Sequence, residues 1–244
     1  MSGTQEFLFD LSDTGGVDYT DESTNIDART LDEMRELMAA YPQPRSALIP
    51  MLHLVQSVDG RVSSVGVRVC AELLGISAAA VVGVATFYTM FKRKAAGQHH
   101  IGVCRTALCA VMGGDILMER VSEKLGIKDG ETSPDGKFSL EAIECNAACD
   151  FAPVMMVNWE FFDNMTPDKV EKLLDDLRVG NRVQSPRGAQ LTSWREAERV
   201  IAGFSDGRAD EGPGAGEASL AGVQAARVNN WRAPDAKSMT GAAQ

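Results

Sequence analysis

The alternation of apolar and polar positions predicts a bundle of four helices in residues 29–96. Apolar side chains recur there every three or four residues, the spacing that places them on one face of a helix. The four apolar faces begin at Leu31, Leu48, Val65 and the alanines that follow Ser77. Thr30 and Glu33 have the spacing of a capping box for the first helix, and Gly75 ends the third. This part of the chain is therefore expected to fold as a small helical domain.

From Gly97 the pattern changes to short apolar segments separated by turn residues. Four segments have the length and composition of strands, namely 99–104, 138–143, 154–157 and 160–162. Asn158-Trp159 is expected to form the turn of a hairpin between the last two. Helical patterns follow the first strand, ending at Gly126, and the fourth strand, beginning at Thr166-Pro167. This order predicts a small α/β domain over residues 97–180 with a thioredoxin-like layout.

The two ends of the chain differ in composition from the rest. Residues 1–28 are acidic and polar and are expected to form a flexible leader. In the extension 181–244, Ser193 and Glu196 form a capping pair before a helix expected at 194–204, and a shorter helix is expected at 220–231. Residues 206–219 are rich in Gly, Ala and acidic side chains, which indicates a linker. The fold class predicted is thus α+β, with a helical bundle, a thioredoxin-like α/β domain and a partly irregular extension.

Charge and composition narrow the functional classes. Apolar residues make up 44% of the chain and charged residues 24%, as is usual for a globular protein. The formal net charge of −10 repels phosphate backbones and anionic lipid, so neither nucleic acid nor direct membrane binding is expected. No apolar run reaches the roughly 20 residues that span a bilayer, and the acidic N-terminus lacks the features of a signal or transit peptide. We expect a cytoplasmic protein.

Four of the five cysteines form two close pairs, Cys104-x4-Cys109 and Cys145-x3-Cys149, and Cys70 stands alone. Clustered cysteines in a reducing compartment indicate metal or redox chemistry rather than disulfides. A [2Fe–2S] cluster requires four thiolates, two for each iron. Each pair follows a predicted strand, so two loops at one end of a sheet can converge on one cluster. We also expect Cys109 to open a helix whose N-terminal N–H groups favour an anion.

Other interpretations of these residues are less favourable. Structural zinc usually binds to tight C-x2-C knuckles, whereas the x4 and x3 gaps here are wider, and no C-x-x-C redox motif is present. We expect Cys70 to be a buried structural thiol and Phe87, Tyr88 and Phe91 to pack in the bundle core. His99 and His100, at the start of the first strand, are not needed as ligands beside four cysteines. Gly214-x-Gly216 follows no strand and is rejected as a dinucleotide loop.

Five ordered motifs carry a resemblance to a known family. They are Tyr-Pro-x-x-Arg-Ser-Ala at 41–47, Ala-Thr-Phe-Tyr-Thr-Met-Phe at 85–91, Val-Cys-x4-Cys at 103–109, Pro-Asp-Gly-Lys-Phe at 134–138 and Glu-Cys-x3-Cys-x3-Pro at 144–153. With these motifs the chain resembles the family of the 24-kilodalton-type subunit of NADH–quinone oxidoreductase, respiratory complex I. The resemblance implies a helical domain followed by a thioredoxin-like ferredoxin domain that holds one [2Fe–2S] cluster. It carries the four ligand roles over to Cys104, Cys109, Cys145 and Cys149.

The resemblance also implies partners and a location. NADH and FMN are expected on a partner subunit that oxidises NADH, with which this chain exchanges single electrons. Other subunits of the peripheral arm are further partners, and the chain would meet the inner face of the membrane only through the complex. The equivalent subunit of an NAD-linked formate dehydrogenase or hydrogenase, or a zinc-stapled interaction protein, stays open as an alternative.

The chain departs from the family pattern near two of the cysteines. Members often have Leu-Gly-Ala-Cys at the fourth ligand, where this chain has Asn146-Ala147-Ala148-Cys149. If the glycine has a positive φ, Ala147 is strained or its loop is rearranged. After the second ligand, Met-Leu-Arg-Gly is replaced by Ala110-Val111-Met112-Gly113. These changes remove no ligand, but they can alter the reduction potential of a cluster.

Overall fold

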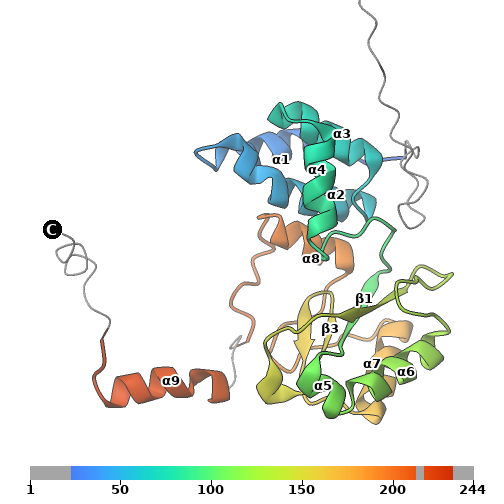
Figure 1. Ribbon diagram of the computed structural model, residues 1–244, viewed down its shortest axis with the longest axis vertical. Coiled ribbons are helices and arrows are strands. Elements are labelled where there is room, and N and C mark those ends of the chain that lie inside the picture. Colours follow the sequence, from blue (N-terminus) through green and yellow to red (C-terminus); the bar gives the residue numbers. More distant parts are fainter. Residues whose placement is uncertain (1–22, 213–216, 233–244) are drawn as a thin grey trace, which may run out of the picture.

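The computed structural model describes residues 23–212 and 217–232. Four helices form an N-terminal bundle: α1 (Ala28–Ala39), α2 (Leu48–Asp59), α3 (Ser64–Leu74) and α4 (Ala78–Phe87), with a 3-10 turn, η1 (Pro44–Ala47), before α2. The bundle lies above a separate layer of strands and helices (Figure 1). Buried side chains from all four helices form its core, including Met34, Met51, Leu52, Cys70 and Val81.

Local signals explain where the bundle helices begin and end. Ser63 and Ser77 cap α3 and α4 by accepting backbone N–H groups, and Gly75 ends α3 with a positive φ of 63°. The predicted capping box of Thr30 and Glu33 is wrong. Helix α1 begins a turn earlier because the Asp27 side chain accepts the Thr30 N–H at 2.8 Å. Glu33 is therefore free to pair with arginines.

The aromatic motif at the end of α4 packs differently from the prediction. Phe91 is buried in the bundle, as expected, but the Phe87 side chain is 77% exposed and Tyr88 is 39% exposed. The helix ends at Phe87 and the backbone of Tyr88 is extended, so both rings lie beyond the bundle core. They pack edge to face on each other, with ring centroids 4.9 Å apart.

The second layer is a mixed sheet of four strands in the order β2-β1-β3-β4. The strands are β1 (His99–Cys104), β2 (Phe138–Ile143), β3 (Met155–Val157) and β4 (Glu160–Phe162). Strands β1 and β2 are parallel, and the other neighbours are antiparallel. The predicted hairpin is present, since Asn158 and Trp159 have positive φ values of 50° and 72°. Strand β3 begins one residue later than expected.

Helices α6 (Gly114–Leu125) and α7 (Pro167–Val179) lie side by side against the sheet (Figure 1). The core between them and the strands contains Ile101, Val103, Leu117, Phe138, Met155 and Leu174. A helical bundle followed by a small α/β domain is the predicted fold class, and it is confirmed.

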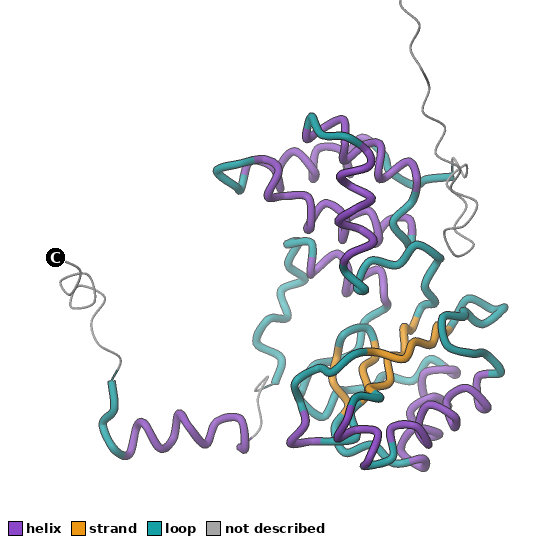
Figure 2. The backbone as a smooth tube through the Cα atoms, viewed as in Figure 1, coloured by secondary structure: helices purple, strands orange, loops and turns teal. Residues whose placement is uncertain are grey.

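The chain then returns to the bundle. Helix α8 (Trp194–Ile201) begins with the predicted capping box of Ser193 and Glu196, and it packs against α2. Figure 2 shows a long irregular segment on either side of α8. Helix α9 (Glu217–Val228) follows, a few residues earlier than predicted. Among the described residues no single helix is long and apolar enough to cross a bilayer, although α3 and α4 together reach that length and composition with a 120° bend between them.

Candidate metal centre

The parallel pairing of β1 and β2 brings two cysteine loops to one end of the sheet. Cys104 is the last residue of β1, and it stands opposite Ile143, the last residue of β2. Parallel strands end at the same edge of a sheet, so the loop that carries Cys145 leaves beside Cys104. Cys104 and Cys109 are buried, with 2% and 3% of their surface exposed, whereas Cys145 and Cys149 are exposed. At this end of the sheet, one pair of thiols is thus buried and the other pair is open to solvent.

Cys109 lies within a short helix, α5 (Ala107–Val111), so the prediction that it opens a helix is wrong. Its backbone N–H donates to the Thr106 carbonyl at 2.9 Å and is therefore already paired. The next helix comes very close behind the pair, because a Cβ at Gly114 would lie 2.6 Å from the Cys104 carbonyl oxygen and 2.9 Å from that of Cys109. Only glycine fits there.

The exposed pair lies on a tight loop. The Sγ atoms of Cys145 and Cys149 are 3.8 Å apart, and the Ala147 N–H donates to the Cys145 sulfur at 3.4 Å. Ala147 has a positive φ of 54°, the strained backbone expected where family members have glycine. Cys149 begins a 3-10 turn, η2 (Cys149–Phe151). The strained alanine therefore directs an N–H toward the sulfur that needs a donor when ionised.

The thiols influence one another across the two pairs. Burial raises the pKa of Cys109, and the neighbouring Cys104 thiol raises it further, while a hydrogen bond from the Val154 N–H opposes both. The pKa of Cys149 is raised chiefly by its hydrogen bond to Cys145 and by the charge of that neighbour, with Cys104 contributing. These raised pKa values favour the protonated form of Cys109 and Cys149, and binding of a positively charged metal group would oppose that effect.

The number and pairing of the thiols match the donor set of a two-iron group. Within the described ranges, no three His, Cys, Asp or Glu side chains converge closely enough to hold one ion. Zinc needs four ligands around a single centre, whereas a [2Fe–2S] cluster takes two thiolates at each of two irons. Two thiol pairs on neighbouring loops therefore supply the donors that a two-iron group takes.

A buried polar atom beside the thiols also fits such a group. The Nδ2 atom of Asn146, next to Cys145, is buried and has no hydrogen-bond partner. A buried donor without an acceptor costs about 1–3 kcal/mol, so native proteins rarely leave one unpaired. An anionic sulfur cluster would supply the acceptor. In the sequence, Asn146 stands out only as a departure from the family pattern. Its suitability as a donor to the cluster becomes visible only from the burial of its amide in the structure.

The remaining candidate residues lie away from this site. Cys70 is fully buried in the bundle, where burial raises its pKa to about 12, which confirms it as a buried structural thiol. His99 and His100 stand at the opposite end of β1 from Cys104. His100 contacts Ser139 and Glu141, each at 2.9 Å. Gly214-x-Gly216 lies outside the described residues.

Fold and site together define a thioredoxin-like iron–sulfur protein. The sequence model of the thioredoxin-like [2Fe-2S] ferredoxin family matches residues 34–178, more than half of the chain, so the chain belongs to that family. A curated relative, the E subunit of NADH-quinone oxidoreductase from Mycobacterium tuberculosis, is 49% identical over 208 residues, which cover 85% of this chain and 82% of the relative. The corresponding protein of Rickettsia bellii is 40% identical over 157 residues, covering 63% of this chain and 94% of its own length. The family resemblance drawn from the motifs is confirmed.

A solved structure supports the fold alone. An NAD+-reducing [NiFe]-hydrogenase in its air-oxidised state superposes with a TM-score of 0.50 at 15% identity. The match covers 55% of this chain and 23% of that longer chain.

Proposed function

We propose that this chain is the electron-transfer subunit of an NADH–quinone oxidoreductase, with one [2Fe–2S] cluster bound to Cys104, Cys109, Cys145 and Cys149. The observation that carries the proposal is the meeting of two thiol pairs at the end of β1 and β2 in a member of this ferredoxin family. Two relatives that are named as subunits of this oxidoreductase align with 85% and 63% of the chain. Their names support the assignment of the chain to that complex.

The residues of this chain hold and shield the cluster. When bound, a cluster of this type supplies one-electron redox chemistry at its iron atoms. Cys104 and Cys109 would grip it from the buried side, where Ala152 and Val154 exclude water. Cys145 and Cys149 would hold the open side, to which a redox partner has access. The Ala147 N–H and the Asn146 amide would offset part of the negative charge.

An apolar patch beside Cys109 offers a surface for that partner. Four large side chains on α5 and α6 and between them are exposed, namely Leu108, Val111, Met112 and Ile116. We assign this patch to the subunit that binds FMN and NADH, because it adjoins a buried ligand of the cluster and electron exchange needs a short distance. Hydride transfer would belong to the flavin of that subunit, because flavins and nicotinamides carry that chemistry and an iron–sulfur cluster exchanges single electrons. Contact with the cytoplasmic face of the membrane would come through the other subunits of the complex.

Iron and acid-labile sulfide analysis of the purified chain, with electron paramagnetic resonance of the reduced form, tests this proposal. We expect equal amounts of iron and sulfide, a red-brown colour and a reduced-state signal. Cys104→Ser should lose most of the iron, whereas the control Cys70→Ala, a buried thiol in the bundle, should keep all of it. Colourless protein that contains zinc would overturn the proposal, and co-purifying subunits of a hydrogenase or formate dehydrogenase would assign the chain to those enzymes.

A further inference from the structure

Arg187 lies in the segment after α7, beyond residues 34–178 that match the family. Its guanidinium group sits over the ring of Phe161, 4.1 Å from the centroid, and 5.6 Å from the centroid of Phe151. Cation–π contacts act within about 6 Å of a ring centroid. One cation therefore joins two aromatic rings from different parts of the α/β domain.

The guanidinium is fixed in place by further contacts. Its Nε and Nη2 atoms donate to the two carboxylate oxygens of Asp163 at 3.0 and 3.1 Å. The Arg187 backbone N–H donates to the Ser185 hydroxyl at 3.0 Å. The Arg187 and Asp163 side chains are only 22% and 11% exposed. A planar, paired and partly buried guanidinium of this kind holds its neighbours in one geometry.

The two rings belong to the walls of the thiol site. Phe151 ends the 3-10 turn that Cys149 begins. Phe151 and Phe161 both pack against the small apolar cluster that contains Cys104 and Cys109. The Phe151 carbonyl also accepts the Asn164 N–H at 2.8 Å, which ties the turn to the segment after β4. Whatever fixes Phe151 thus fixes the backbone two residues from Cys149.

We propose that Arg187 is a positioning residue for the cluster, which holds the Cys149 turn through Phe151 and Phe161 while Asp163 orients its guanidinium. The inference rests on the proposed function, since it concerns the geometry of a proposed ligand. Arg187 touches no ligand itself. The segment after α7 thereby acquires a function in the redox site, although it lies outside the matched family region.

Arg187→Gln tests the proposal in the full chain. We expect a chelator to remove iron about tenfold faster, the usual scale for loss of a residue that orients a ligand. The reduced-state resonance spectrum should change shape, because the Cys149 sulfur no longer has a single geometry. Arg187→Lys should recover only part of both properties, since an ammonium group cannot pair in a planar fork. Asp163→Asn keeps the shape of the side chain and removes its charge. It should change the rate of iron release and the reduced-state spectrum in the same direction as Arg187→Gln.

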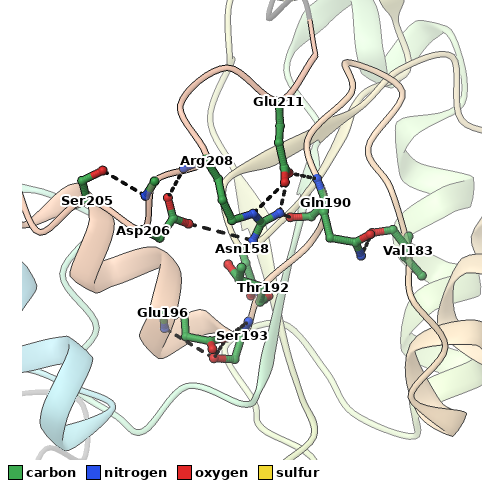
Figure 3. Close-up of polar contacts among 11 residues, drawn as sticks. Asn158, Val183, Gln190, Thr192, Ser193, Glu196, Ser205, Asp206, Arg208 and Glu211 are labelled. Atoms are coloured by element: carbon green, nitrogen blue, oxygen red, sulfur yellow. Dashed lines mark hydrogen bonds and ion pairs between the residues drawn. The ribbon is translucent and has the colours of Figure 1, made fainter.

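Arg208→Gln is the matched control. Arg208 lies in the same extension, is 28% exposed and pairs with Glu211 through Nε and Nη2 (Figure 3). The Arg208→Gln substitution should leave the rate of iron release and the reduced-state spectrum unchanged. Arg187→Gln with the spectrum and release rate of the unmodified chain would overturn the inference, as would an equal effect of Arg208→Gln. Lack of iron in the unmodified chain would overturn the proposed function instead, so the two failures are distinct.

Discussion

His53 and Glu198 are in direct contact across 145 positions of sequence, with His53 Nδ1 2.6 Å from Glu198 Oε2. Both side chains are buried, the histidine on α2 and the glutamate on α8. The same carboxylate accepts the Gln56 amide at 2.6 Å and the Trp159 indole N–H at 2.8 Å. Because Trp159 lies in the β3–β4 turn, one side chain of the extension joins the bundle to the sheet.

Removal of this carboxylate should destabilise the protein strongly. Glu198→Ala leaves His53, Gln56 and Trp159 without their buried acceptor, and we expect the free energy of unfolding to fall by about 3 kcal/mol. Urea unfolding followed by circular dichroism measures the change. The exposed control Glu36→Ala should stay within about 0.5 kcal/mol of the unmodified chain. A similar small effect for Glu198→Ala would show that α8 contributes little to holding the layers together.

Ala147→Gly should stabilise the loop of the exposed thiols. The positive φ of 54° costs an alanine about 1–2 kcal/mol, which glycine would not pay. Glycine also increases the entropy of the unfolded chain, and this offsets part of the gain. We expect the cluster-free protein to gain about 0.5–1 kcal/mol in free energy of unfolding. Ala148→Gly is the control, because Ala148 has a φ of −110° and glycine there should destabilise. Equal effects of the two changes would contradict the assigned strain.

Asn146→Leu, which restores the residue common in the family, should lower the reduction potential of the bound cluster. The change removes a buried amide donor, and hydrogen bonds to the sulfurs favour the more negative reduced form. We expect the equilibrium constant for one-electron reduction to fall about tenfold, which is about 59 mV. A redox titration followed by electron paramagnetic resonance gives the value. An unchanged potential at full iron content would mean that the amide does not face the cluster.

Stability should decline on mild acidification because of His100. Burial lowers the pKa of this histidine, and the hydrogen bond with Glu141 only partly opposes the effect, with the Lys92 charge adding to it. The unfolded chain binds a proton near the ordinary pKa of about 6.5 while the folded chain resists it. The stabilisation is therefore complete above pH 6.5 and is progressively lost as the pH falls below that value. Urea unfolding at pH 7.5 and 5.5 should show a lower free energy of unfolding at the lower pH. His100→Asn should reduce this difference. An equal difference in the variant and the unmodified chain would contradict the assignment to His100.

Local signals in the sequence were sufficient for most of the secondary structure. Ser63, Ser77 and Thr166 cap helices because a short side-chain oxygen satisfies free N–H groups whatever surrounds it. Gly75, Gly126 and Gly180 end helices because their left-handed backbone costs no steric strain. The error at Thr30 had a local cause, since Asp27, an equally good cap, stood three residues earlier.

By itself, the sequence determined the cysteine spacing, the order of elements and the family. These properties depend on the nearest neighbours in the chain or on motifs that can be read directly. The tertiary structure alone decided which segments meet across long distances: α8 on α2, and Arg187 on the rings beside Cys149. Such contacts depend on how separate surfaces fit when water is excluded, and neither periodicity nor spacing encodes them. The sequence thus identified the proposed ligands of the thiol site, and tertiary packing decided which residues surround them.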